Sequence, residues 1–310
     1  MREVFEDSRS MNVNERTAQA RGSIRLFLAA VIWGAAFVAQ RVGMDYVGPF
    51  TFNAVRNLIG AMVLLPVMAG LKKTGRSHGP LFPVDRPVLI GGAACGFFLF
   101  IASNLQQVGL QYTSVGKAGF ITALYIVTVP VLGILFGQKT GLRTWISVVI
   151  AVAGLYLLCI TEKFTIGGGD ILELLCAIAF AFQILAVDRY SRRADPTMLA
   201  CLEFFVCGIL SLIPAFLFET ITVQQLWAAK IPILYAGVLS CGVAYTLQIL
   251  GQRDVKPALA SLIMSLESVV SAIAGWLLLG QKLSLRELCG CAVMFAAILL
   301  AQMPAKTKNA

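Results

Sequence analysis

Charged residues are scarce in this sequence, and their scarcity excludes most soluble architectures. They make up 13% of the 310 residues, whereas 58% are hydrophobic and the mean hydropathy is +0.81. A soluble domain usually has about a quarter of its residues charged, because its surface faces water. The composition therefore predicts a membrane protein.

Several catalytic signatures are also missing. Histidine occurs once, as His78 in the polar stretch KKTGRSHGP, which excludes a Ser-His pair or a histidine metal site within the apolar segments. There is no phosphate-binding GxxxxGK[ST] pattern and no CxxC pair. All eight cysteines lie in apolar segments, where cysteine usually acts as a small apolar filler. We predict no catalytic residue, no metal and no cofactor, and the missing phosphate-binding pattern argues against ATP hydrolysis by this chain.

Long apolar segments are what the sequence has instead. A helix needs about 20 mostly apolar residues to cross a bilayer. Ten segments meet this requirement, with approximate bounds 23–43, 49–70, 88–111, 115–136, 142–161, 170–189, 197–218, 231–251, 257–279 and 285–303. We predict an all-α membrane protein with ten transmembrane helices. The polar stretch before Ser23 favours an uncleaved first span over a signal peptide.

The positive charges predict the orientation in the membrane. If the N-terminus is cytoplasmic, 18 basic residues lie on that side and 6 on the other, with Arg56 inside a span. By the positive-inside rule, both termini are then cytoplasmic. We predict that the membrane is the plasma membrane of the cell. No loop is long enough for a clustered basic surface, so nucleic acid is excluded as a partner.

Two similar segments reveal an internal repeat. LFGQKTGLR (Leu135–Arg143) and LLGQKLSLR (Leu278–Arg286) are 143 positions apart, each after the fourth span of a group of five. Because five is odd, the second group begins on the other side of the membrane and is inverted. We predict tails at 1–22 and 304–310, a first five-helix repeat over 23–161 and a second over 170–303. Inverted repeats are typical of secondary transporters, whose substrate site lies near the midplane.

The repeat segments resemble a known family. GLQYTSVGKAGFITALYIVTVPVLGILFGQK (109–139), LIMSLESVVSAIAGWLLLGQKLSLRELCG (262–290) and IWGAAFV (32–38) are similar to helices of the EamA-type branch of the drug/metabolite transporter superfamily. The resemblance covers nearly the whole chain. It implies that spans one to four and six to nine enclose a cavity, with spans five and ten at the periphery. Two departures are Gly-Gln for the usual Gly-Glu at 137–138 and 280–281, and Leu-Glu-Ser for Leu-Glu-Pro at 266–268.

Arg56 is the one basic residue that lies well inside a span rather than near its end, in the stretch TFNAVRNLIG. Charges in hydrocarbon are costly and usually mark a substrate or ion pathway. Asn53 precedes Arg56 by three positions and shares its helix face. One interpretation is that this face binds a substrate carboxylate or phosphate through the guanidinium. The other is that Arg56 extends to the interface or pairs with an acid.

Two glutamates are candidates for proton coupling. Pro49 and Pro196 begin corresponding spans of the two repeats and are 147 positions apart, and the same separation makes Glu203 the counterpart of Arg56. The two residues should nevertheless differ in depth by about 10 Å of a 30 Å core and should not pair. Glu203 is alternatively a structural acid. Glu267 lies near the midplane, where a charge costs most and a proton could be taken up. Ser268 belongs to a stripe of small residues around Glu267. We predict that it binds substrate, and the alternative is that the stripe is a surface for helix packing.

Neutral polar and aromatic side chains complete the predicted substrate site. They are Trp33, Gln40, Asn104, Gln107, Tyr125, Tyr245 and Gln248. Such groups bind zwitterions and amides, but each is also common in interhelical hydrogen bonds or packing.

The hypothesis is a secondary transporter of a small organic, amino-acid-like or amphipathic metabolite that works by alternating access. Protons are a candidate coupling ion, and the family resemblance favours export over import. The alternatives are a proton-coupled multidrug exporter, a membrane-embedded enzyme or lipid-modifying protein, and a non-transporting sensor or scaffold. An enzyme would need a buried nucleophile next to a base, and no residues are spaced for it.

Overall fold

The computed structural model describes residues 13–73, 86–113, 115–160, 167–279 and 284–303, and these form helices joined by short turns without strands. Outside this part lie the second GQK turn at 280–282, His78, residues 1–12 of the N-terminal tail and the C-terminal tail at 304–310. The first repeat consists of α1 (Val13–Gly43), α2 (Pro49–Lys73), α3 (Arg86–Tyr112), α4 (Val115–Ala123), α5 (Tyr125–Leu135) and α6 (Leu142–Cys159).

The second repeat begins at α7 and contains more interruptions. It consists of α7 (Gly168–Ser191), α8 (Pro196–Phe218), α9 (Val223–Ala228), α10 (Lys230–Leu234), the π-helix η1 (Tyr235–Tyr245), α11 (Thr246–Gln252), α12 (Pro257–Met264), α13 (Glu267–Leu279) and α14 (Leu285–Gln302). In the described part, nine segments are long and apolar enough to cross a membrane. The remaining expected span, α6, has a shorter apolar stretch, Leu142–Leu158.

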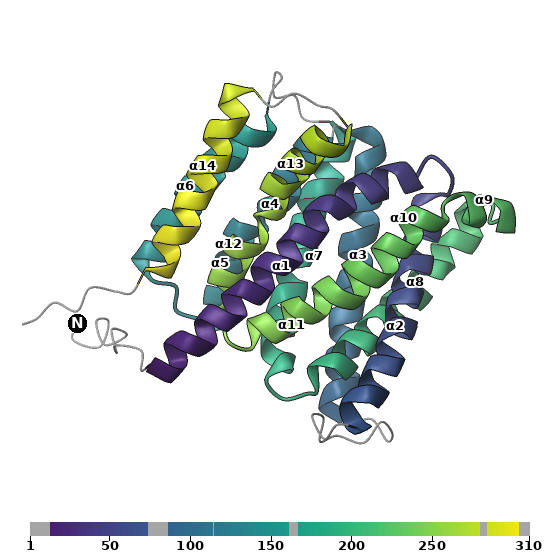
Figure 1. Ribbon diagram of the computed structural model, residues 1–310, viewed down its shortest axis with the longest axis horizontal. Helices are drawn as coiled ribbons and strands as arrows, with labels where there is room; N and C mark the ends of the chain where they lie inside the picture. The colour runs from purple at the N-terminus through teal and green to yellow at the C-terminus, as the bar shows by residue number, and fades with distance from the viewer. Residues whose placement is uncertain (1–12, 74–85, 114, 161–166, 280–283, 304–310) are drawn as a thin grey trace, which may run out of the picture.

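The helices run back and forth between two faces of the molecule (Figure 1). We call the face at which α1 begins the N face; it carries Arg25 and Asp254, which pair across α1 and the end of α11. The other we call the opposite face. There Glu219, after α8, accepts hydrogen bonds from the backbone N–H groups of Phe50 and Thr51 at the start of α2, both at 2.8 Å.

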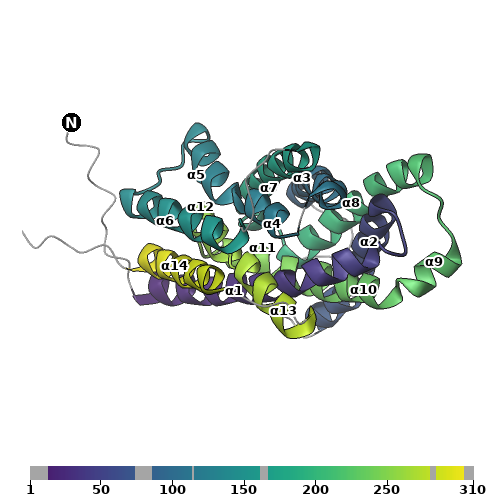
Figure 2. The same cartoon turned by 90° about the horizontal axis from the view of Figure 1, so that it is seen from above.

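The spans that the family resemblance places at the periphery do lie at one end of the molecule. α6 and α14 are side by side there in both views (Figures 1 and 2). Gly154 and Gly290 make this contact close, because a Cβ atom on Gly290 would lie 2.8 Å from the carbonyl oxygen of Gly154. Small residues let membrane helices approach in this way.

Many large apolar side chains on the outside of the bundle are exposed. Val149, Phe216 and Leu299 are examples on three different helices, each more than 60% exposed. Soluble proteins rarely expose so many large apolar side chains to water, whereas lipid tails solvate such side chains in a bilayer. The exterior therefore fits contact with lipid, and the polar side chains gather inside.

Two of the expected spans are interrupted within the membrane, and a third changes its helix type. The fourth is interrupted at Leu124, between α4 and α5, and the ninth at Ser265 and Leu266, between α12 and α13. The eighth contains the π-helix η1, whereas its repeat counterpart α3 is a continuous helix. The ninth span is thus interrupted even though Ser268 stands where the family usually has proline. Discontinuous helices are a common feature of transporter substrate sites.

The glycine of the first GQK turn ends α5. Gly137 has φ = 78°, a left-handed conformation that glycine adopts without a Cβ clash. The N–H of Gln138 then donates to the carbonyl of Gly133 at 2.8 Å, which closes the helix end in a Schellman motif.

Candidate functional site

A cavity lies among these helices and is lined by residues of both repeats. Its lining combines one arginine, one glutamate, several amides and a set of aromatic rings. The lining residues are Trp33, Phe37, Gln40, Arg56, Gln106, Tyr125, Phe180, Gln183, Ile184, Ser240, Tyr245, Gln248, Met264 and Glu267. Seven of them belong to the site predicted from the sequence. Their role in substrate binding remains a prediction, but the structure brings them to one place.

Arg56 reaches this cavity from α2 and is 5% exposed. Its guanidinium lies 5.8 Å from the centre of the Phe52 ring. In the described part of the chain no carboxylate forms an ion pair with it, and its Nε is buried without a hydrogen-bond partner. A buried guanidinium without an anion is costly, so a substrate anion would fill an unmet requirement.

Glu267 enters the cavity as the first residue of α13. The hydroxyl of Tyr125, the first residue of α5, donates to Glu267 Oε1 at 3.0 Å. The breaks in the fourth and ninth spans thus bring their two resumed helices together at one hydrogen bond. Each member of this pair therefore lies at the point where its span resumes after the interruption.

An aromatic wall is held in place by the π-helix of the eighth span. The indole N–H of Trp33 donates to the carbonyl of Ser240 at 3.3 Å, and the Trp33 and Tyr245 rings meet edge to face at 4.7 Å between centroids. Short π-helical segments occur often at functional sites. Trp33 therefore both packs against η1 and faces the cavity.

Gln183 and Gln248 form a chain of amides from the cavity to Glu203. Gln248 Nε2 donates to Gln183 Oε1 at 3.2 Å, and Gln183 Nε2 donates to Glu203 Oε1 at 2.7 Å. Glu203 is fully buried, its Oε2 has no partner among the described residues, and no ion pair joins it to Arg56. Glu203 thus has surroundings of its own, one step behind the cavity wall.

Four other predicted residues lie away from the cavity lining. Asn53 donates to the carbonyl of Ser103 and to Asn104 Oδ1, at 2.9 and 3.1 Å, and Asn104 donates to Ser211 Oγ at 2.8 Å. These bonds join α2, α3 and α8. Asn53 and Asn104 thus form hydrogen bonds between helices, which was the alternative to substrate binding for the polar residues. Gln107 donates to the carbonyl of Gln40 at 3.4 Å, and Ser268 Oγ is buried without a partner among the described residues.

Seven lining residues were not predicted: Phe37, Gln106, Phe180, Gln183, Ile184, Ser240 and Met264. For two of them the repeat held a signal. The pattern LQxxG occurs at 105–109 and 247–251, and it pairs Gln106 with the predicted Gln248. The 147-residue separation likewise pairs Phe180 with the predicted Trp33. Gln183 could have been found as a lone amide in the apolar run of α7.

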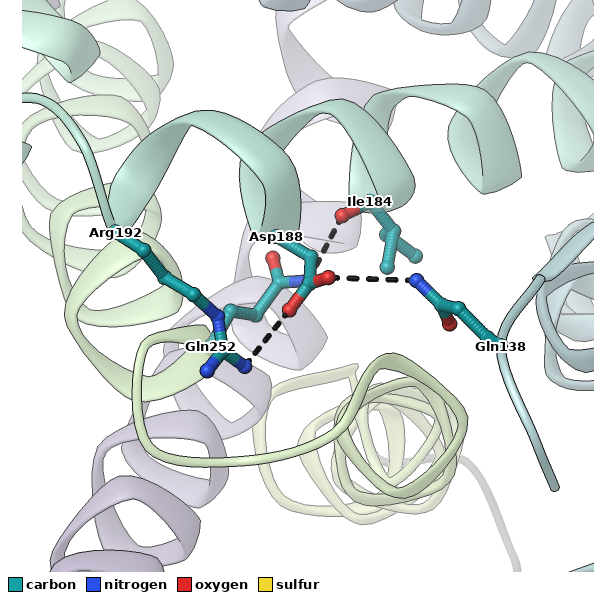
Figure 3. Close-up of polar contacts among 5 residues, drawn as sticks. All are labelled: Gln138, Ile184, Asp188, Arg192 and Gln252. Carbon is teal, nitrogen blue, oxygen red and sulfur yellow. Dashed lines mark hydrogen bonds and ion pairs between the residues drawn. The ribbon is translucent and has the colours of Figure 1, made fainter. Parts of the chain in front are cut away.

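Polar contacts join α7 to the end of α11 and to the first GQK turn (Figure 3). Gln252 at the end of α11 donates to the carbonyl of Ile184, a lining residue, at 3.0 Å. Farther along α7, Asp188 pairs with Arg192 at 3.1 Å and accepts a hydrogen bond from Gln138 of the first GQK turn at 3.4 Å. Asp188 therefore ties the end of the fourth span to α7.

The comparisons with known proteins agree with this architecture. A model of the EamA-like transporter family matches residues 20–160 and, a second time, residues 167–303. The chain belongs to the EamA-like transporter family. It is accordingly a multi-pass membrane protein with the transporter function of that family.

Relatives are similar over most of their length. An EamA-type relative from Archaeoglobus fulgidus, described as an uncharacterized transporter, is 30% identical over 279 residues that cover 90% of this chain and 84% of the relative. The uncharacterized inner membrane transporter YedA of Escherichia coli K12 is 25% identical, covering 89% of this chain and 88% of its own. A solved chain, 18% identical, shares the fold with a TM-score of 0.76 over 94% of this chain and 99% of its own length.

Proposed function

We propose that this EamA-family chain exports a small organic metabolite bearing a carboxylate, such as an amino-acid-like or amphipathic solute, in exchange for protons. The observation that carries the proposal is Arg56, buried at the cavity without an ion-pair partner among the described residues. A guanidinium binds a carboxylate through two parallel hydrogen bonds, which gives orientation as well as affinity.

The rest of the lining supports a zwitterionic or amphipathic solute. The cavity combines aromatic and apolar side chains with a few polar groups, as small-molecule sites usually do. Gln40, Gln106 and Gln248 offer amide donors and acceptors, and Trp33 and Tyr245 offer apolar faces. The single acid of the lining, Glu267, is a suitable partner for an ammonium group.

Glu267 also supplies a mechanism for coupling. A proton and a substrate ammonium group would each neutralise its carboxylate, so binding of one would favour release of the other. Competition at a single site is sufficient for exchange when the cavity alternates between the two faces. With the N face in the cytoplasm, as the positive charges predict, an inward proton gradient would drive the solute outwards.

The aromatic wall supports a second candidate, a proton-coupled multidrug exporter. Trp33, Phe180 and Tyr245 could accept an apolar cation without any use of Arg56. The two candidates differ in the need for Arg56, because a drug without a carboxylate gains nothing from it. Both are transport functions, and we propose no catalytic reaction for the chain.

The decisive experiment compares metabolites inside and outside cells that lack or overproduce the chain. Export predicts that a carboxylate-bearing metabolite accumulates inside when the chain is absent and outside when it is abundant. Reconstitution in liposomes then tests the metabolite so found. Folded protein that moves it no faster than empty liposomes would overturn the proposal. Resistance to drugs without any metabolite change would favour the multidrug candidate.

A further inference from the structure

A third buried glutamate, after Glu267 and Glu203, lies near the cavity without taking part in its lining. Glu173, in the first turns of α7, is 0% exposed. Glu173 lies one helical turn from Asp170 on α7. Asp170 is at the opposite face, where it accepts a hydrogen bond from Thr113 Oγ1 at 2.7 Å. Glu173 is therefore deep enough to be shielded from water but only one turn from the face.

The carboxylate of Glu173 is held between α3 and α4. Its Oε2 accepts a hydrogen bond from Thr122 Oγ1 at 2.6 Å. Its Oε1 lies against the backbone of α3, where a Cβ atom on Gly109 would be 2.6 Å away, so that only glycine fits. This Oε1 has no hydrogen-bond partner among the described residues.

The surroundings of Glu173 offer no compensating cation in the described side chains. No ion pair is formed with it there, and the titratable groups that face it are Asp170 and Cys176, both from α7. Thr122 from α4 and Gly109 from α3 carry no charge. A buried carboxylate without a cation is relieved by taking up a proton, and Oε1 is the atom free to bind it.

The break in the fourth span connects this glutamate with the cavity. Thr122 lies before the break and Tyr125 after it, three positions apart, and each hydroxyl donates to a different buried glutamate, Glu173 or Glu267. The thiol of Cys176 is within electrostatic range of both carboxylates. One short stretch of chain therefore contacts both acids.

We propose that Glu173 is a second proton-binding site, on the route by which protons pass between the opposite face and Glu267. The proposal rests on the coupling role proposed above for Glu267. In the transfer an O–H bond of Glu267 breaks and an O–H bond forms on Glu173 Oε1, while one negative charge moves the other way. Release to water near Asp170 completes the route, and no oxidant or reductant is involved.

Infrared spectroscopy of the purified full chain tests this proposal, with D₂O as the probe. A protonated carboxyl group has a carbonyl stretching band distinct from that of a carboxylate, and the band shifts when deuterium replaces the proton. Glu173→Gln is expected to remove one such band at neutral pH. If Glu173 lies on the route, the same variant should slow deuterium exchange at the Glu267 carboxyl several-fold.

Two further variants make the assignment firm. Asp45→Asn removes an exposed acid after the end of α1 and should leave both the bands and the exchange unchanged. Thr122→Val keeps Glu173 but removes its hydrogen bond, so it should shift the Glu173 band to higher frequency, which identifies the band even if Glu173→Gln does not fold.

The outcomes separate this proposal from the proposed function. Bands that are identical in wild type, Glu173→Gln and Thr122→Val would overturn the proton site, and unchanged exchange at Glu267 would overturn the route. Neither measurement needs a transported solute, so the failure of every transport assay would leave this result intact and would count against the transporter mechanism alone.

Discussion

Arg56 and Glu267 face the same cavity, but their charges are satisfied to different degrees. Glu267 accepts a hydrogen bond from Tyr125, whereas Arg56 has an aromatic contact with Phe52 and no ion pair in the described chain. At the scale of single residues, Arg56 therefore lacks a partner of opposite charge, and an anionic group of a substrate could supply it. This difference makes substitutions at the two positions separable in their effects.

Substitution of Arg56 should weaken substrate binding according to the geometry of the replacement. Hydrogen bonds to charged groups contribute about 1.5–3 kcal/mol, so Arg56→Gln should raise the apparent KM at least about tenfold. Arg56→Lys keeps the charge but loses the two parallel N–H donors of the guanidinium, so its apparent KM should lie between those of the wild type and Arg56→Gln. The measurement is exchange of the identified substrate in liposomes, with the exposed Arg41→Gln as the matched control. Equal transport by Lys and Gln variants would show that Arg56 serves the fold or the membrane interface.

Substitution of Glu267 should uncouple transport from the proton gradient. Glu267→Gln resembles the protonated acid but cannot release a proton, so gradient-driven accumulation should be lost while substrate exchange persists. Glu267→Asp retains an ionisable group and should recover part of the accumulation. Both are measured in liposomes with and without an imposed pH gradient. Accumulation by Glu267→Gln at the wild-type level would contradict a coupling role.

At the scale of helices, the sequence predicted which segments cross the membrane but not where they break. Hydropathy and the GQK repeat were sufficient for ten spans in two inverted groups, because both are properties of whole segments. Breaks at Leu124 and at Ser265 involve neither proline nor glycine, so no local residue marks them.

Faces of helices were predicted less well for the same reason. Consecutive residues differ by about 100° around a helix, so Gln107, which the sequence analysis chose, and its neighbour Gln106 face different sides of α3. Gln107 bonds to the backbone of α1, and Gln106 lines the cavity. Tertiary packing decides this rotation, and a single sequence without the LQxxG comparison does not contain it.

The turn that ends α5 offers a test of helix termination with an internal control. Gly137 and Gly141 both have open space where a Cβ atom would be, but only Gly137 has a positive φ. Gly137→Ala should therefore lower the free energy of unfolding by about 1–2 kcal/mol through backbone strain alone. Gly141→Ala, in the extended region with φ = −71°, should change it much less. Thermal unfolding in detergent provides the comparison, and equal losses for both variants would contradict the role of the left-handed glycine.

At the scale of the whole molecule, polar contacts join helices at both the N face and the opposite face. The N face has the Arg25–Asp254 pair and the contacts of Asp188, whereas the opposite face has Glu219 bound to the start of α2. Alternating access requires one set to open while the other holds. Each contact is modest, which suits a protein that must pass between conformations of similar free energy.

Removal of the Arg25–Asp254 pair should therefore shift the balance between the two conformations without unfolding the chain. The pair is 3.2 Å long and its side chains are 34% and 28% exposed. A partly exposed pair contributes about 0.2–1 kcal/mol, which changes an equilibrium by at most about fivefold. Arg25→Gln should raise hydrogen exchange of the backbone around Leu250–Val255 at the N face by such a factor.

The opposite face distinguishes a conformational shift from a general loss of stability. If the N face opens more often, Phe50 and Thr51 at the opposite face stay closed more of the time, and their hydrogen exchange should fall. Arg21→Gln, an exposed residue one turn earlier on α1, should change neither face. Mass spectrometry of peptides from both faces gives the two rates in one experiment. An equal rise at both faces in Arg25→Gln would mean that the pair only stabilises the fold, and alternating access would then need another closing contact at the N face.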